Sequence, residues 1–222
     1  MTDYISLETL DDKEILFIGD KHTDEKEINF KQILEKYDMT KNVLLLSETT
    51  ENLSGNLGRL YSMLKKNKTN EVIQADIRTT KYNELNKLKI GIMIFKHQNS
   101  LLELWNKEKK EEFKNLIKDN IRENIFPGLR NALKIFDELD KKELCTKFIN
   151  EFKIILQKLN KDESIKLNVK ISDTINRFYN VLNDYLNRVF EEHLIELIKN
   201  ETKYKKIIIH VGTMHIDNIM SM

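Results

Sequence analysis

Two short apolar runs that end in the same pattern constrain this sequence most. Near its start, Ile15–Ile18 leads into Gly19, and His22 follows that glycine by three residues. Near its end, Ile207–Ile209 leads to Gly212, and His215 again follows by three residues. Short apolar runs that stop at a glycine are typical of buried parallel strands. If both strands lie in one sheet, the two GxxH segments become neighbours.

The first 97 residues alternate strand and helix signals. We expect strands at Ile15–Ile18, Val43–Leu46 and Val72–Ala75, with a helix that begins at a capping box of Asp24 and Glu27. Short connections between alternating strands and helices indicate right-handed crossovers and a parallel sheet. The segment 88–95 is ambiguous, because its periodicity fits a buried strand and a buried helix equally well.

The remaining sequence predicts a helical segment followed by a final strand. Apolar residues recur at helical spacing through most of residues 98–203, with a break expected at Phe126-Pro127-Gly128. We therefore predict one α/β domain over residues 1–222 with a mainly parallel central sheet. Residues 1–97 and 204–222 form its sheet core, and residues 98–203 form a large helical insertion between the third or fourth strand and the C-terminal strand.

Charge and composition exclude several functional classes. The 37 basic and 36 acidic residues nearly cancel, which gives no support to a nucleic-acid or membrane-surface partner. No apolar stretch approaches the ~20 residues needed to span a bilayer. The single cysteine, Cys145, excludes an intramolecular disulfide and is expected to be a packed structural thiol. We expect a cytoplasmic protein, and the oligomeric state stays open.

Polar side chains directly follow the predicted strands. Because the carboxyl ends of parallel strands meet at one edge of a sheet, we expect these side chains to share a ligand-binding crevice. The set consists of Asp20, His22, Glu48, Asp76, Arg78 and His215.

Within this set, two histidines and a glutamate carry the chemistry. His22, Glu48 and His215 match the ligands that a zinc-like divalent metal accepts while leaving a position open for water, and Asp76 is a further candidate ligand. The same groups can also take a proton from water without a metal. Arg78 is suited to holding a substrate carboxylate or stabilising an oxyanion. Gly19 and Gly212 are expected to turn the chain sharply and leave room for a ligand.

Structural roles compete with each of these assignments. His22 can simply precede the predicted helix, Asp20 can be a solvated loop residue, and Asp76 with Arg78 can form a structural ion pair. His210, at the strand end, also suits a hydrogen-bonded core histidine. His97 and His193 lie in charge-rich helical surroundings and are expected at the surface or in packing.

The motifs resemble those of the TraB/Tiki, ChaN and erythromycin-esterase superfamily. The resemblance rests on Gly19-Asp20-Lys21-His22, Glu48 and Gly212-Thr213-Met214-His215 and covers residues 1–80 and 204–219. It implies an α/β core with a helical insertion and a hydrolase-like site of His22, Glu48 and His215, with Asp76-Ile77-Arg78 near the family's arginine. Tiki members are thought to be metal-dependent peptidases, ChaN-like members bind haem, and erythromycin esterases open a macrolactone. Only seven residues follow His215, so we expect little behind it to hold it in place.

The sequence thus predicts a hydrolase, peptidase- or esterase-like, that acts on a small-molecule or peptide substrate with or without a divalent metal ion. The alternative is a non-catalytic protein on the same fold that binds a ligand such as haem or a metal, or an interaction protein that uses its helical half. A metallophosphoesterase, with Asp20-Lys21-His22 as its D-x-H motif, fits less well because GDxxD and GNHE-like segments are missing.

Overall fold

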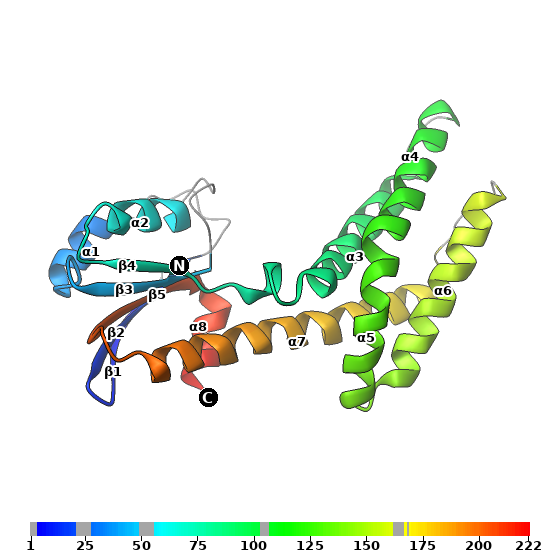
Figure 1. The fold of residues 1–222 in the computed structure, drawn as a ribbon. Coiled ribbons are helices and arrows are strands. Elements are labelled where there is room, and N and C mark those ends of the chain that lie inside the picture. Colours follow the sequence, from blue (N-terminus) through cyan, green and yellow to red (C-terminus); the bar gives the residue numbers. More distant parts are fainter. Residues whose placement is uncertain (1–3, 21–27, 49–55, 103–106, 162–166, 168) are drawn as a thin grey trace. The chain divides into compact units, whose positions relative to one another are not determined.

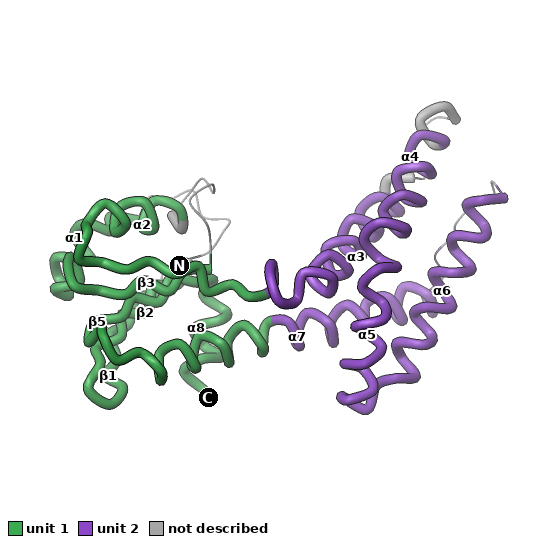
Figure 2. The backbone as a smooth tube through the Cα atoms, in the orientation of Figure 1, with its two compact units in different colours: residues 1–77, 187–222 green, residues 78–186 purple. Residues whose placement is uncertain are grey.

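The computed structural model describes residues 4–20, 28–48, 56–102, 107–161, 167 and 169–222. These residues form a mixed α/β protein with a mostly parallel sheet, which confirms the predicted class. The chain divides into two compact units (Figure 2). Unit 1 comprises Met1–Ile77 and Asn187–Met222, and unit 2 comprises Arg78–Leu186.

The described part of unit 1 is built on a five-stranded sheet of order β1-β2-β5-β3-β4 (Figure 1). The strands are β1 (Tyr4–Leu10), β2 (Lys13–Asp20), β3 (Val43–Ser47), β4 (Glu71–Gln74) and β5 (Lys206–Gly212). β5 lies between β2 and β3 and pairs in parallel with both, so the two strands that precede the GxxH segments are neighbours. β3 also pairs in parallel with β4.

The first strand of the sheet was not among the strands predicted from the sequence. β1 pairs antiparallel with β2 along its whole length, from Tyr4 opposite Gly19 to Leu10 opposite Lys13. The two-residue connection starts at Asp11, which has a φ of 56°, a left-handed conformation that aspartate tolerates in tight hairpins. Pairing on both sides extends β2 to Asp20, so Gly19 lies inside the strand and not in an exit loop.

Helices cover both faces of the sheet, as a mainly parallel sheet requires. On one face α1 (Phe30–Lys36) and α2 (Asn56–Lys65) pack onto Leu16, Ile18 and Leu45. On the other face, the end of α7 (Val169–Asn200) and α8 (Thr213–Met220) pack onto alternating residues of the same strands. The predicted capping box at residues 24 and 27 lies outside the described residues; α1 begins at Phe30, where the Asn29 side chain accepts a hydrogen bond from the Gln32 N–H.

Unit 2 is helical around its own apolar core. Its elements are η1 (Ile77–Thr79, which starts one residue earlier), α3 (Asn83–Leu102), α4 (Lys107–Asn120), the π-helical turn η2 (Ile121–Ile125), α5 (Phe126–Glu138), α6 (Lys142–Asn160) and the first part of α7. The ambiguous segment 88–95 belongs to α3, where burial recurs every three or four residues. Pro127 occupies the first turn of α5, where its missing N–H costs little, so the expected break is only a π-helical turn.

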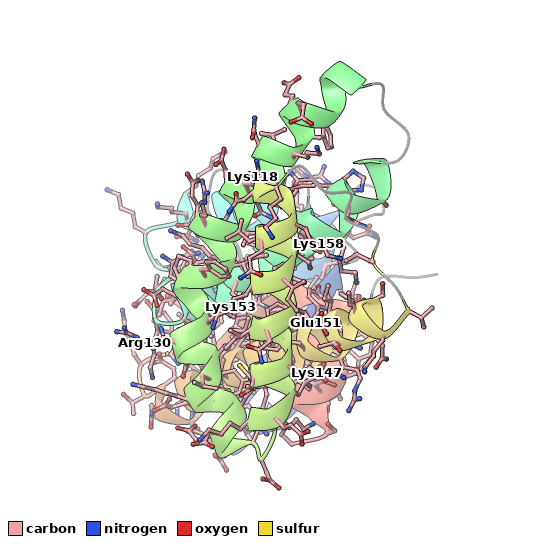
Figure 3. The ribbon with its side chains drawn as sticks, turned by 90° about the vertical axis from the view of Figure 1, so that its right-hand side faces the viewer. Lys118, Arg130, Lys147, Glu151, Lys153 and Lys158 are labelled. Atoms are coloured by element: carbon pink, nitrogen blue, oxygen red, sulfur yellow. The ribbon has the colours of Figure 1, made fainter. Side chains whose placement is uncertain are left out.

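Charged side chains project from the helices of unit 2. Figure 3 shows Lys118, Arg130, Lys147, Glu151, Lys153 and Lys158 on α4, α5 and α6. Residues 78–97, which the sequence assigned to the sheet core, belong to this helical unit. Their assignment depended on reading residues 88–95 as a possible strand. In the part of the chain that the structure describes, no helix combines the length and apolarity needed to cross a membrane.

Candidate functional site

The carboxyl ends of three neighbouring strands meet at one edge of the sheet in unit 1. Asp20 at the end of β2 lies opposite Gly212 at the end of β5. Ser47 at the end of β3 lies opposite His210, and the next backbone N–H, that of Glu48, donates to the His210 carbonyl at 3.2 Å. Glu48 and His215 therefore follow adjacent strands, as the strand-edge prediction requires.

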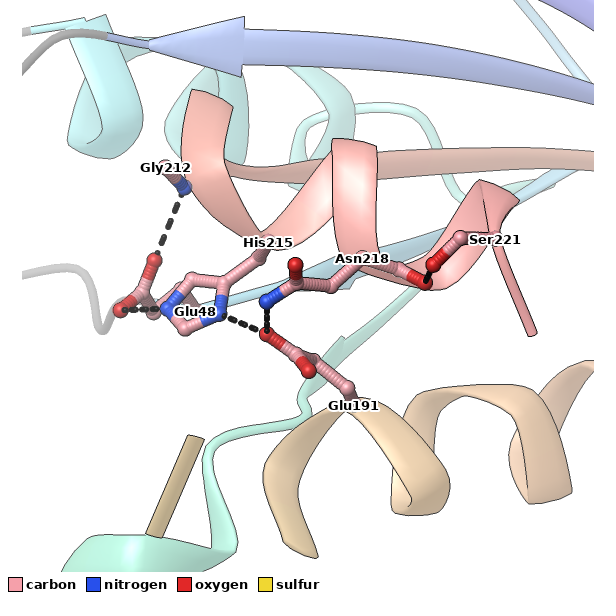
Figure 4. Close-up of polar contacts among 6 residues, drawn as sticks. All are labelled: Glu48, Glu191, Gly212, His215, Asn218 and Ser221. Carbon is pink, nitrogen blue, oxygen red and sulfur yellow. Dashed lines mark hydrogen bonds and ion pairs between the residues drawn. The ribbon is translucent and has the colours of Figure 1, made fainter. Parts of the chain in front are cut away.

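The ring of His215 lies between two carboxylates (Figure 4). Its Nδ1 is 2.7 Å from Glu191 Oε1, a hydrogen-bond distance. Its Nε2 is 3.7 Å from Glu48 Oε1, too long for a direct hydrogen bond. The exposed fractions of the three side chains are only 7% for His215, 15% for Glu48 and 3% for Glu191. A buried imidazole that faces a carboxylate at each nitrogen is the central feature of the site.

Glu48 is held at the start of α8. Its Oε2 accepts a hydrogen bond from the Gly212 N–H at 3.0 Å. The first turn of α8 contains no acidic residue, and Gly212 gives no side-chain cap, so Glu48 supplies the negative charge that a helix N-terminus favours. Gly212 has a φ of −58°, which any residue can adopt, and so it does not make the glycine-specific sharp turn expected from the sequence.

Glu191 ties α7 to α8. The oxygen that contacts His215 also accepts a hydrogen bond from Asn218 Nδ2 at 2.8 Å. Asn218 follows His215 by three residues on α8, so the two side chains share one helix face. The neighbouring Phe190 ring meets the His215 ring edge to face, with centroids 5.0 Å apart. The residues after His215 thus help to hold it, contrary to the expectation from the short remaining sequence.

Glu191 and Asn218 are site residues that the sequence prediction missed. One signal was available for Glu191. On α7 the buried positions Phe190, Leu194 and Ile198 recur at helical spacing, and Glu191 adjoins this apolar stripe, where it is itself buried. A carboxylate at such a position is costly unless it has a partner, which makes it a candidate for a functional contact.

Gly19 brings α8 close to the sheet. A Cβ added at this position would lie 2.9 Å from Ile216 Cδ1 and 3.2 Å from Thr213 Cα, both on α8. α8 and the Tyr4 side chain of β1 therefore fill the space beside Gly19, where we expected room for a ligand.

The other predicted site residues lie in several places. His22 lies outside the described residues, and for Asp20 the structure describes only its backbone in β2. Asp76 is half-buried two residues after β4, and Arg78 is buried on η1 as the first residue of unit 2. Their roles stay predictions.

The other histidines fit structural roles. His210 is fully buried in β5, with its ring edge-to-face against Phe30 at 5.4 Å, which agrees with a core role. His97 is exposed on α3, and the half-buried His193 lies 3.9 Å from Glu196.

The described donors fit part of a metal site. Two ligands that each lie ~2.0–2.2 Å from a zinc-like ion are ~3–4 Å apart, so His215 Nε2 and Glu48 Oε1 are suitably spaced. A carboxylate on the other ring nitrogen, as Glu191 provides, is the usual support of a metal-bound histidine. A cluster of three or more His, Cys, Asp or Glu side chains able to hold a metal ion does not occur among the described residues, which exclude His22.

Comparisons with protein-family models, curated proteins and solved structures give no match. The resemblance of residues 19–22, 48 and 212–215 to the TraB/Tiki, ChaN and erythromycin-esterase superfamily therefore stays a prediction. The geometry of His215 and its two carboxylates is the basis on which a function can be proposed.

Proposed function

We propose that the protein is a hydrolase, esterase- or peptidase-like, whose strand-edge site activates water for attack on a small-molecule or peptide substrate. One observation carries the proposal: the buried His215 ring has Glu191 at Nδ1 and Glu48 across a 3.7 Å gap at Nε2. Histidine is the commonest general acid–base group, and buried titratable groups held by specific partners are typical of catalytic sites.

The gap between Nε2 and Glu48 Oε1 is where the water would be activated. A water that bridges these two atoms makes hydrogen bonds of ~2.8 Å to both, which a 3.7 Å separation allows. His215 Nε2 takes a proton from this water while the water oxygen attacks the acyl carbon. When the ester or amide bond breaks, the same nitrogen returns the proton to the leaving oxygen or nitrogen. Gly212 keeps Glu48 beside the water by donating to its other oxygen.

A divalent metal ion is compatible with the same site. His215 Nε2 and Glu48 Oε1 would be two of its ligands, and His22 and Asp76 stay predicted ligands. When bound, such an ion supplies Lewis-acid activation of water. The contact of Glu191 with Nδ1 supports this variant, and it also supports the second candidate function, a protein that binds metal or haem without turnover.

The proposal is tested by hydrolysis assays on the purified protein with activated esters, peptides and a phosphomonoester. His215→Gln and Glu48→Gln should each lower hydrolysis by ~10²–10⁴-fold, because the first removes the group that takes the proton and the second removes the carboxylate that holds the water. The control is His97→Gln, on the exposed surface of α3, which should leave the rate unchanged.

The outcomes of these assays separate the alternatives. Full activity in His215→Gln, or no hydrolysis of esters or peptides by the wild type, contradicts the proposal. Bound metal or haem without turnover favours the binding protein, and turnover of the phosphomonoester alone favours a metallophosphoesterase. Metal analysis before and after a chelator, together with the rate, decides whether a divalent ion takes part.

We propose, in addition, that unit 2 is a helical insertion in the sheet unit. Its elements follow β4 and precede β5 in the chain, and its apolar core is its own, which supports this arrangement. A cytoplasmic location and the absence of nucleic-acid and membrane partners stay predictions from the charge balance.

A further inference from the structure

We infer that Glu191 and Asn218 are positioning residues that keep the proton of neutral His215 on Nδ1, so that Nε2 is the working nitrogen. The inference rests on the proposed function and refines it, because it assigns the side of the ring on which the reaction takes place. Neither residue would touch the substrate, since both act through the His215 ring.

The shared oxygen of Glu191 fixes the direction of the hydrogen bonds. Asn218 Nδ2 can only donate, so Glu191 Oε1, 2.8 Å away, accepts from it. If the Glu191 carboxylate is ionised, it can only accept, and His215 Nδ1, at 2.7 Å from the same oxygen, is then the donor. Because Glu191 is buried, the low local dielectric strengthens both bonds.

The opposite nitrogen is thereby left with its lone pair. A neutral imidazole carries one N–H, so a proton committed to Nδ1 makes Nε2 the acceptor. Nε2 faces Glu48 Oε1 across 3.7 Å without a direct hydrogen bond. The edge-to-face contact with Phe190 limits rotation of the ring. Water or a metal ion would therefore bind at Nε2, on the Glu48 side of the ring, whereas Glu191 orients the ring from the Nδ1 side.

A purely structural role for Glu191, tying α7 to α8, predicts the same contacts, so the test must report on the ring itself. Protein labelled with ¹⁵N at its five histidines gives long-range ¹H–¹⁵N correlations that distinguish the two tautomers. The His215 signals are identified by their loss in His215→Gln. Spectra of the whole chain at about pH 8.5 should show His215 with the proton on Nδ1.

Two variants and a matched control complete the experiment. Glu191→Gln should remove the preference for the Nδ1-protonated form and lower hydrolysis by ~10–100-fold, the usual effect of losing such a support. Asn218→Ala should have a smaller effect in the same direction. The control is Glu192→Gln, at the adjacent residue on α7. The Glu192 carboxylate lies 3.8 Å from Arg188, so this variant should leave the tautomer unchanged.

Each outcome supports or overturns the inference. A proton on Nε2 in the wild type, a doubly protonated ring at about pH 8.5, or an unchanged tautomer in a folded Glu191→Gln contradicts it. If Glu191→Gln fails to fold, the wild-type tautomer and Asn218→Ala decide. A tautomer that depends on Glu191 in a protein without hydrolytic activity would support the positioning role and refute the proposed function.

Discussion

The two units of the molecule use their interiors differently. Unit 2 buries an apolar cluster in which Phe148 stacks on Phe178 with ring centroids 3.8 Å apart. Arg130 and Lys153, labelled in Figure 3, are examples of basic side chains on the exposed surface of its helices. Unit 1 has apolar layers on both faces of its sheet, but at the strand edge it also buries His215 against Glu191.

This difference separates stability from function. Burying a charged or titratable group costs free energy, and well-packed apolar residues often stabilise a site as well as an ion pair does. The His215–Glu191 contact is therefore weak evidence for a stabilising role and better evidence for a chemical one. Unit 2 also buries polar groups, such as the Asn120 amide, which donates to the Gly91 carbonyl at 2.8 Å. Within its apolar cluster, however, substitutions should act mainly through packing.

The largest expected effect on stability comes from a substitution that would create a cavity in unit 2. Phe148 is fully buried between Phe152 and Phe178, so Phe148→Ala should lower the free energy of unfolding by ~3–5 kcal/mol. Urea unfolding followed by circular dichroism measures the loss. The control is Leu116→Ala on α4, a side chain that is 47% exposed and should change stability little.

The reactivity of Cys145, which lies in the apolar core of unit 2, reports whether Phe148→Ala loosens that core. Burial raises the pKa of its thiol to about 11, which leaves roughly 100-fold less thiolate than an ordinary cysteine at about pH 8. Its reaction with a thiol reagent should be slow in the wild type and faster in Phe148→Ala, while the His215 tautomer stays unchanged. A changed tautomer would show that the two interiors are coupled and would break the comparison.

A smaller effect is expected where two helices of unit 2 approach closely. A Cβ at Gly128 of α5 would lie 2.6 Å from the Glu84 carbonyl oxygen and 2.7 Å from Leu88 Cβ on α3. Gly128→Ala would favour the helix by ~0.5–1 kcal/mol if there were room, but the clash should outweigh this gain. We expect a net loss of ~1–3 kcal/mol in the free energy of unfolding. Arg130→Ala, on the exposed side of the same helix, is the matched control.

The sequence predicts the sheet better than it predicts the site. Apolar runs mark β3 and β4 to within one residue and β2 to within two, whereas β5 continues three residues past its predicted run, to Gly212. Buried parallel strands such as β3 and β5 are apolar along most of their length, which makes such runs visible in the sequence. It misses β1, which is half-exposed and joined to β2 through Asp11, without the glycine that usually marks a hairpin. The sequence could not assign the segment 88–95 to a helix or a strand, because its apolar residues fit both periodicities. Packing within unit 2 makes it part of helix α3.

Half of the described site follows from strand order. Glu48 and His215 could be placed together because each follows a parallel strand, and those strands proved to be adjacent. The contact of Glu191 with Asn218 and His215 could not be predicted, because it depends on how α7 and α8 pack and no local pattern encodes that packing. A sharp turn was expected at Gly212, whereas α8 begins directly after it at Thr213 and gives His215 a helical support.

The smallest expected effect concerns an ion pair on the surface of unit 1. Lys203 Nζ donates to Glu71 Oε2 at 3.0 Å at the edge of the sheet, and this hydrogen bond holds the pKa of Glu71 below its ordinary value of 4.5. A lowered carboxyl pKa contributes stability that is present above about pH 4.5 and is lost as the pH falls through the lowered value. The urea midpoint should therefore drop less between about pH 6 and pH 3 in Glu71→Gln than in the wild type.

The matched control for this pair lies in unit 2. Asp137 and Lys142 form an exposed ion pair at 3.1 Å, and Asp137→Asn should change the urea midpoint little at either pH, because water and salt screen such pairs. An acid-dependent loss in Glu71→Gln as large as in the wild type would assign the pH dependence to other carboxylates.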